Sequence, residues 1–275
     1  MRRLSIPVYF ILSFLLLFVS GCTYSEGDHP DVNGENKGYP MTVEDDLGRQ
    51  VTIREAPGRI VSLAPANTEI LFALGLGNKV VGVTDYCDYP PEAKGKDKVG
   101  DFYAPSIEKI IALEPDLIFA TGGVQAEVVR QLEDLGETVV ALDPKNVEDV
   151  LGAIGLTGQL TGTGEKAKAV TARMKQSMEK VREGLSGLSP GQKPEVFVLV
   201  WYEDGKVFSA GPGTFVSSIV SMAGGKNVAD DAKEEYPQYS MEKLMEKNPE
   251  VIISTAHGYR NPEDVKKILT LGDSK

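Results

Sequence analysis

The sequence predicts an α/β protein made of two similar parallel-sheet lobes joined by a long helix, with a ligand crevice between the lobes. The first observation is a gapless internal repeat, in which residues 106–121 match residues 240–255. Each copy predicts a helix that stops before a proline and a buried parallel strand directly after it, because the residue before proline is disfavoured in the α region and the next run is short and apolar. Crevices between domains commonly bind small ligands.

The second observation is a helical pattern between the two copies. From 166 to 185, apolar residues recur every three or four positions, which is typical of one face of a long amphipathic helix. We expect this helix to bridge the lobes and to allow only small opening motions. The chain has 275 residues, 41% of them hydrophobic and 25% charged, which is an ordinary globular composition with enough length for two modest domains.

The strands expected in the first lobe are short apolar or β-branched runs. They lie at 59–64, 80–83, 117–121 and 138–142, after a predicted β-hairpin over 42–53. Asn67 or Thr68 is the expected cap of the next helix, which should end at Gly75. The irregular segment 84–91 follows a strand end, where α/β sheets place binding loops, and a further helix is expected over 125–135.

The second lobe is expected to begin with a strand at 196–200 and a helix at 215–222, followed by the second repeat copy and a short helix over 262–269. Together these patterns predict a domain order. The expected segments are a signal peptide over 1–21, a flexible tether over 22–40, the first lobe over 41–145, a helical linker with the bridging helix over 146–190, and the second lobe over 191–275.

The N-terminus has the three parts of a lipoprotein export signal. Arg2 and Arg3 precede an apolar stretch over 6–19 that has the length of a signal-peptide core, and Val-Ser-Gly then leads to Cys22. We therefore expect Cys22 to be lipidated and the mature protein to sit on the outer face of the cell membrane, attached by that lipid. Cys87 is then the remaining cysteine, so we expect no disulfide, and a lone cysteine is usually a small buried apolar residue.

Several classes of function fit the sequence poorly. A formal charge of −11 disfavours nucleic acid and anionic membrane surfaces as partners. The two histidines, His29 and His257, cannot form a clustered imidazole metal site, and no G-x-S-x-G element accompanies them. The glycine-rich segment 158–166 lacks the ending of a phosphate-binding loop. We expect neither an enzyme nor a metal site.

Aromatic residues gather in the expected strand-end loops of both lobes. The set comprises Tyr86, Tyr89, Phe102, Tyr103, Trp201, Tyr202, Tyr236 and Tyr239. Rings presented from two sides suit a large flat ligand, and the hydroxyl groups can satisfy its polar edges. Partial packing into the core is the alternative for each of these side chains.

Residues 59–71, the segment 83–91 and both repeat copies resemble the cobalamin-binding receptors of ABC importers, which belong to the wider cobalamin and ferric-siderophore solute-binding family. The resemblance extends from about residue 41 to the C-terminus. It implies a monomeric, lipid-anchored receptor that captures a corrinoid between two lobes and delivers it to permease subunits with their ATPase. Cobalamin would be the transported ligand, and no cofactor is implied.

The resemblance also implies roles for individual residues. Glu69 and Glu242 match the glutamates that dock against the permease, although as residues on predicted helices they also fit a plain solvated surface. The aromatic residues that match ligand-facing positions are Tyr86, Phe102, Trp201 and Tyr236. Where such receptors carry a tryptophan after the first repeat strand this chain has Thr121, so we expect a looser sandwich around the ligand. Family members continue for several tens of residues beyond residue 275, so we expect the second lobe to be incomplete here.

Other ligands and functions fit less well. A ferric-siderophore or haem receptor of the same family is the main alternative. Siderophore sites tend to use arginine clusters, which the loops lack. A tyrosine can ligate haem iron, so the haem alternative stays open. A surface hydrolase would need a nucleophile and a base, and a sensor would need a transmembrane helix to a partner; the sequence shows neither.

Overall fold

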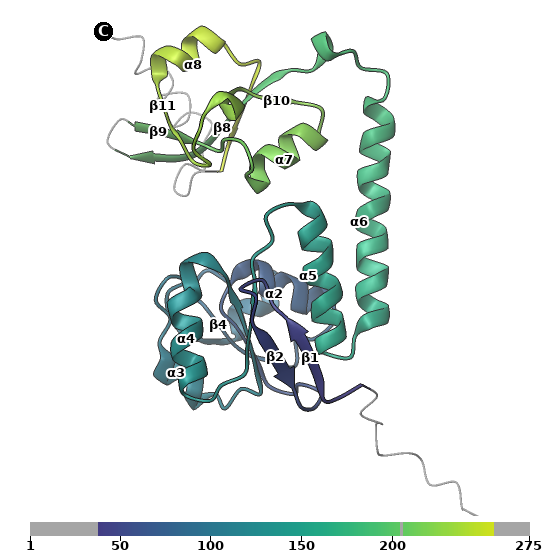
Figure 1. The fold of residues 1–275 in the computed structure, drawn as a ribbon, viewed down its shortest axis with the longest axis vertical. Helices are drawn as coiled ribbons and strands as arrows, with labels where there is room; N and C mark the ends of the chain where they lie inside the picture. The colour runs from purple at the N-terminus through teal and green to yellow at the C-terminus, as the bar shows by residue number, and fades with distance from the viewer. Residues whose placement is uncertain (1–37, 204–205, 256–275) are drawn as a thin grey trace, which may run out of the picture. The chain divides into compact units, whose positions relative to one another are not determined.

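The computed structural model describes residues 38–203 and 206–255, and the first lobe in it contains an entirely parallel five-stranded sheet (Figure 1). The strand order is β5-β4-β3-β6-β7. Their bounds are β3 (Ile60–Ser62), β4 (Val80–Val83), β5 (Asp97–Lys98), β6 (Leu117–Thr121) and β7 (Val139–Leu142). Four of these strands confirm the sequence expectation. The two-residue β5 is too short to leave an apolar pattern, and sequence reasoning missed it.

A β-hairpin precedes the sheet, as expected. Strands β1 (Met41–Glu44) and β2 (Gln50–Ile53) pair antiparallel. Asp45 closes the turn by accepting hydrogen bonds from the backbone N–H groups of Leu47 at 3.1 Å and Arg49 at 3.0 Å. The same carboxylate accepts a bond from the N–H of Ala141 in β7 at 3.0 Å. One buried side chain therefore ties the hairpin to the edge strand of the sheet.

The helices of the first lobe follow the strands in sequence. They are α2 (Pro65–Ala73), α3 (Ile107–Ala112), α4 (Ala126–Asp134) and α5 (Val147–Leu160), with short 3₁₀ turns η1 (Pro91–Gly95) and η2 (Gly123–Gln125). The expected helix over 125–135 is confirmed as α4, preceded by η2. Residues 143–146 connect β7 to α5, so α5 begins soon after the last strand of the sheet.

The expected cap of α2 is wrong. The helix begins at Pro65, whose fixed φ suits the first helical position, and its N-cap is Ala64. Asn67 and Thr68 lie buried inside the helix instead. Asn67 Nδ2 donates to the carbonyl of Ala120 at 2.9 Å, and Thr68 Oγ1 donates to Ser62 Oγ at 2.8 Å. Both polar side chains fasten α2 to the sheet, which is why they are not used at its end.

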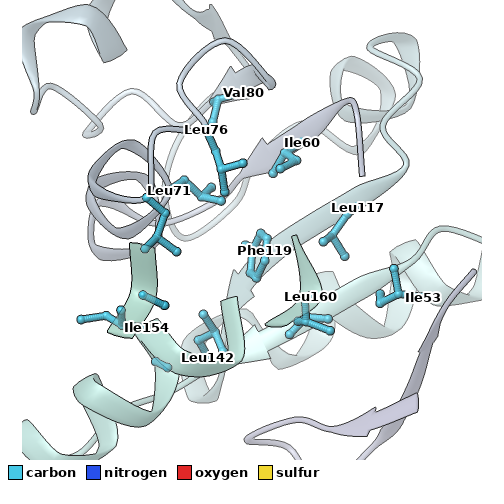
Figure 2. Close-up of a cluster of buried hydrophobic side chains, with 14 of the residues drawn as sticks. Ile53, Ile60, Leu71, Leu76, Val80, Leu117, Phe119, Leu142, Ile154 and Leu160 are labelled. Carbon is cyan, nitrogen blue, oxygen red and sulfur yellow. The ribbon is translucent and has the colours of Figure 1, made fainter. Parts of the chain in front are cut away.

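The core of the first lobe lies on both faces of the sheet. On one face Phe119 packs with residues from the hairpin, α2 and α5, and Figure 2 shows it at the centre of this cluster. The labelled members include Ile53, Ile60, Leu71, Leu76, Leu142, Ile154 and Leu160. The other face is covered by α3 and α4 through residues such as Ile110, Val129 and Leu132. Since Ile154 and Leu160 belong to α5, that helix packs into the core of the first lobe.

The long helix α6 (Gly164–Leu185) confirms the amphipathic pattern expected over 166–185. It lies beside α5 (Figure 1). The two helices approach closely at Gly158, where an added Cβ would lie 2.4 Å from the Cβ of Ala167. The glycine-rich segment 158–166 is thus a tight connection between two helices and has no strand before it, as a phosphate-binding loop would require.

The second lobe contains a mixed sheet. Its strands are β8 (Glu195–Glu203), β9 (Lys206–Ser209), β10 (Lys226–Asn227), β11 (Gln238–Tyr239) and β12 (Val251–Ser254). Strand β12 runs parallel to β8, as expected of the second repeat copy, and the unexpected two-residue β10 is also parallel to β8, whereas β9 and β11 extend the sheet antiparallel. The helices are α7 (Phe215–Met222) and α8 (Met241–Lys247), with 3₁₀ turns η3 (Pro190–Gln192) and η4 (Val228–Asp231). The expected helix over 262–269 lies outside the described residues.

The two repeat copies adopt the same local structure. Ser106 and Ser240 cap α3 and α8, each accepting a hydrogen bond from the backbone N–H three residues on, at 3.3 and 3.2 Å. Glu114 and Asn248, each just before a proline, have positive φ angles of 46° and 44°. The expectation that the residue before proline leaves the right-handed α region is therefore confirmed in both copies.

The acidic residue after each proline also has the same role. Asp116 accepts hydrogen bonds from the backbone N–H groups of Gly58 at 2.7 Å and Arg59 at 3.0 Å. Glu250 accepts one from the N–H of Glu195 at 3.3 Å. Each carboxylate thus holds the backbone at the start of a strand in its own lobe, β3 for Asp116 and β8 for Glu250.

The burial of the two repeat strands differs, and the expectation of a buried second strand is wrong. The side chains of β6 are almost fully buried, whereas those of Val251, Ile252 and Ile253 in β12 are 40%, 39% and 44% exposed. β6 lies between β3 and β7, but within the described part of the chain β12 pairs with β8 alone. Across residues 38–203 and 206–255, no helix is both long and apolar enough to cross a membrane.

The Asp45 contact predicts a pH-dependent stability. Burial by itself raises the pKa of the Asp45 carboxyl, but hydrogen bonds from Arg49 and Ala141 and the Arg49 charge hold that pKa below its ordinary value. The stabilisation is therefore present above the unfolded pKa of about 3.9 and is lost as the pH falls through the lower folded pKa. Asp45→Asn should lower the free energy of unfolding by about 1 to 3 kcal/mol at pH 7, and by much less near pH 3.

Urea unfolding of the mature protein at both pH values measures this difference. Asp134→Asn is the matched control, because Asp134 forms an exposed ion pair with Arg130 at 2.9 Å. This substitution should change the free energy of unfolding by less than about 1 kcal/mol. An Asp45→Asn effect of the same size at pH 3 and pH 7 would contradict an origin in the charge of the carboxylate.

Candidate functional site

The candidate site is built on the carboxyl ends of the first-lobe strands. Because β3, β4, β6 and β7 are parallel, the segments that leave them start at one edge of the sheet. Residues that leave or surround this edge include the 84–90 segment after β4, the 100–105 segment after β5, the 122–125 turn after β6 and the 143–146 segment after β7. Tyr86 and Phe102 stand on the first two of these segments.

The backbone of the segment that carries Tyr86 is held by several hydrogen bonds. Cys87 is fully buried, as expected of a lone cysteine, and its Sγ lies 3.2 Å from Thr84 Oγ1. Lys98 Nζ donates to the carbonyls of Thr84 at 3.2 Å and Cys87 at 3.0 Å. The N–H of Asp85 bonds the carbonyl of Gly100 at 2.9 Å. Tyr86 is consequently an exposed side chain on a backbone that is held in place.

The segment that carries Phe102 is held by a buried amide. Gln125 Nε2 donates to the carbonyl of Phe102 at 2.6 Å and to that of Leu63 at 2.9 Å. Gln125 Oε1 accepts from the N–H of Thr121 at 2.9 Å. The half-buried Phe102 ring contacts Tyr103 edge-on, with ring centres 5.0 Å apart and an interplanar angle of 79°.

A carboxylate links the two aromatic segments. The Asp101 charge raises the pKa of the Tyr86 hydroxyl, with smaller contributions from burial and from a hydrogen bond to the same carboxylate. Asp101 Oδ1 also accepts from the N–H of Tyr103 at 2.7 Å. The structure therefore brings Tyr86 and the Phe102 segment together at this edge of the sheet.

An ion pair stands at the same edge, and sequence reasoning missed it. Lys145 Nζ lies 2.8 Å from Asp143 Oδ2, directly after β7. The hydrogen bond that the Lys145 ammonium donates to this carboxylate raises the pKa of Lys145. Gly122 leaves room for it, because an added Cβ there would lie 2.7 Å from Asp143 Cβ. Two charged residues that follow a buried strand were the available signal.

The second lobe presents two exposed aromatic side chains. Trp201 is 48% exposed and Tyr236 is 54% exposed, similar to the 54% of Tyr86. Trp201 was expected in a loop but lies in β8, where it pairs with Phe208 next to a register shift. Tyr236 precedes β11 on a backbone held by the N–H of Gly211, which donates to the carbonyl of Glu235 at 2.7 Å.

Two of the aromatic residues assigned to loops lie in strands and pack in the core instead. Tyr239 is buried in β11, donates its hydroxyl to the carbonyl of Val228 at 3.0 Å and contacts Phe197 with ring centres 5.4 Å apart. Tyr202 lies in β8 and packs partly buried against the same cluster. The remaining pair, Tyr89 and Tyr103, are exposed.

Glu69 and Glu242 are exposed on α2 and α8. Glu242 lies in the first turn of its helix, where the helix dipole favours a negative charge. Glu69 borders a cavity of about 690 Å³ that sequence reasoning missed. Its apolar lining includes Ile70, Phe72, Ile154, Val170 and Met174, which come from α2, α5 and α6.

Residues 38–203 and 206–255 contain no group of three or more His, Cys, Asp or Glu side chains that could hold a metal ion. The expected lipidation site Cys22 and the histidines His29 and His257 lie outside the described residues.

Comparison with known proteins identifies the family. The sequence pattern of the family described as "Periplasmic binding protein" matches residues 60–270. The chain is 34% identical over 260 residues to the uncharacterized ABC transporter substrate-binding lipoprotein YvrC of Bacillus subtilis (strain 168), covering 92% of this chain and 81% of that protein. It is 30% identical over 200 residues to the vitamin B12-binding protein of Yersinia pseudotuberculosis serotype O:3 (strain YPIII), covering 72% of this chain and 70% of that protein.

A solved structure supports the fold assignment. The periplasmic heme binding protein of Pseudomonas aeruginosa superposes with a TM-score of 0.70 and 25% identity, covering 78% of this chain and 77% of that chain. The two α/β lobes expected from the internal repeat are therefore those of a known architecture. The matched span runs from β3 in the first lobe past β12 in the second, and the chain belongs to the periplasmic binding protein family, whose members bind solutes and are not enzymes.

Proposed function

We propose that this protein captures cobalamin or a related corrinoid and delivers it to an ABC permease with its ATPase. The observation that carries the proposal is a set of aromatic side chains on held backbone: the exposed Tyr86 and the half-buried Phe102 on the first lobe, and the exposed Trp201 and Tyr236 on the second. Exposed rings held on a fixed backbone suit a large flat ligand. The 30% identity to a vitamin B12-binding protein supports the same ligand class.

The charges near Tyr86 favour a corrinoid over the alternatives. An anionic ferric siderophore would need cationic side chains, but the two aromatic segments of the first lobe carry Asp85, Asp88 and Asp101. A haem held by tyrosine would need a phenolate ligand. The Asp101 charge raises the pKa of Tyr86 and so opposes that form. Haem remains the second candidate, because the chain resembles a heme binding protein in fold.

The proposed location is the outer face of the cell membrane. Cys22 follows an apolar stretch of signal-peptide length, and a lipid on its thiol would anchor the mature chain. The relative from Bacillus subtilis is a substrate-binding lipoprotein, which supports this assignment.

The proposed permease contacts are Glu69 and Glu242. Both carboxylates are exposed on helices, one in each lobe, so each can meet a basic side chain of a membrane partner without entering the ligand site. Charges placed in this way contribute mainly to association rate and to the register of the complex.

The ligand proposal predicts a specific loss of affinity. Tyr86→Ala or Tyr236→Ala should weaken cyanocobalamin binding by about 1 to 3 kcal/mol, the range for losing a good but partly exposed contact. Binding should quench the fluorescence of Trp201, the single tryptophan, and give a negative heat capacity change. Calorimetric and fluorescence titrations measure both effects.

Leu135→Ala is the matched control for these titrations. Leu135 is a similarly exposed apolar residue at 59%, but it precedes β7 and therefore lies toward the amino end of that strand, at the opposite edge of the sheet. Its replacement should leave affinity unchanged. A wild-type protein that ignores cyanocobalamin and saturates with haem would contradict the corrinoid assignment and leave the solute-binding class intact.

The docking proposal predicts a separation of transport from binding. The double variant Glu69→Ala, Glu242→Ala should reduce cobalamin uptake in the native host severalfold and leave the affinity in solution nearly unchanged, because neither carboxylate is expected to touch the ligand. Uptake of labelled cobalamin and calorimetric titration are the two measurements.

The control is Glu108→Ala with Glu246→Ala. Both are exposed glutamates, and Glu108 occupies in the first repeat copy the position that Glu242 occupies in the second. This pair should not change uptake. If the Glu69 and Glu242 variant loses affinity as strongly as uptake, the two carboxylates belong to the ligand site.

The anchoring proposal predicts a change of compartment. Cys22→Ser removes the thiol that receives the lipid, so the protein should be found unprocessed or released from membranes, since a polar tether has little membrane affinity of its own. Membrane fractionation with mass analysis of the chain decides the question. Variant protein that is cleaved after residue 21 and still bound to membranes would exclude the lipid anchor.

A further inference from the structure

The side-chain amide of Gln125 is buried and hydrogen-bonded to the protein backbone. The residue is fully buried at the end of η2, and its amide makes three hydrogen bonds to backbone groups. A glutamine amide offers two N–H donors and one carbonyl oxygen, so both donors and the acceptor are occupied. No hydrogen-bonding capacity of this amide is left for a ligand except the second lone pair of its oxygen.

The three partners of Gln125 come from three separate strand ends. Leu63 follows β3, Thr121 ends β6, and Phe102 belongs to the 100–105 segment after β5. Leu63 and Thr121 are parts of the sheet edge and are held by it. Phe102 is not in a strand or a helix, so the bond from Gln125 Nε2 to its carbonyl, the shortest of the three at 2.6 Å, fastens an irregular segment to that rigid edge.

The segment held by this bond carries two aromatic side chains that contact each other. Phe102 contacts the Tyr103 ring at 5.0 Å, and Asp101 binds the N–H of Tyr103 at 2.7 Å. The base of the segment is closed by the bridge between Gly100 and Pro105. The backbone of 101–103 therefore has its base closed by this bridge and its middle held by Gln125.

We propose that Gln125 is a positioning residue for the ligand, which sets the height and direction of Phe102 above the sheet edge without touching the ligand itself. The proposal rests on the proposed function in so far as Phe102 is taken to face the ligand. A glutamine that merely stabilises the fold would change the amount of folded protein, but would not act on affinity through Phe102.

The first test is the affinity of Gln125→Leu for cyanocobalamin, measured by calorimetric titration of the mature protein. Leucine leaves the Phe102 carbonyl without its donor, so the segment should loosen and the affinity should fall about tenfold. Gln131→Leu is the matched control: it is the same substitution on α4, but Gln131 is exposed and bonds only the neighbouring Glu127 side chain at 2.9 Å. The control should bind as the wild type does.

A second pair of variants separates positioning from plain stability. In the Phe102→Ala background, Gln125→Leu should cost no more than about twofold further, because the ring that it positions is gone. An equal fold-loss in the two backgrounds would overturn the proposal, as would wild-type affinity in Gln125→Leu. Gln125→Glu, which keeps the shape and the acceptor for Thr121 but removes at least one of the two donors, gives the same comparison if the leucine variant does not fold.

Amide hydrogen exchange distinguishes this proposal from the ligand assignment, since it requires no ligand. Gln125→Leu or Gln125→Glu should speed exchange in the 100–105 segment at least severalfold, while exchange in the second lobe stays as in the wild type. Unchanged exchange at 100–105 would overturn the positioning role whatever the protein binds. If exchange at 100–105 is faster in the variants but the wild-type protein does not bind cyanocobalamin, the positioning role holds and the corrinoid assignment is rejected.

Discussion

The parallel direction of the first-lobe strands is the constraint on which the candidate site depends. It brings several strand ends to one edge, where the departing backbone has left the sheet ladder and needs other hydrogen-bond partners. Side chains supply them: Gln125 bonds the Phe102 carbonyl, and Lys98 bonds the Cys87 carbonyl. Exposed aromatic side chains therefore stand on fixed backbone, which reduces the ordering cost of binding a ligand.

The internal repeat shows which structural properties are set by a short stretch of sequence and which depend on the rest of the chain. Both copies keep a serine cap, a positive φ before proline and an acidic side chain that bonds the backbone at the start of another strand in its lobe. Burial is not kept. β6 has partners on both sides and apolar clusters on both faces, whereas β12 has β8 as its partner within the described residues. Caps and turns are decided locally, but burial is decided by neighbours from elsewhere in the chain.

The same distinction explains how far the sequence predicts the fold and the site. The limits of α6, α7 and most first-lobe strands follow from periodicity and end signals within a few residues. Asn67 and Thr68 look like caps because their side chains can bond backbone, and only the position of β6 and β3 shows that they bond the sheet instead. The core position of Tyr239 depends likewise on its pairing with β9, which two residues of strand do not reveal.

The site follows from the sequence less completely than the fold. Family membership establishes solute binding, and exposure of Tyr86, Trp201 and Tyr236 agrees with a ligand-facing role that the resemblance suggested. Gln125 left no signal, since a glutamine near a helix start usually faces solvent. The most direct test of the corrinoid proposal is the absorption spectrum of the protein purified from its native host. Corrinoid bands in about equimolar amount with the chain are the expected result, and a haem or ferric-siderophore spectrum would contradict it.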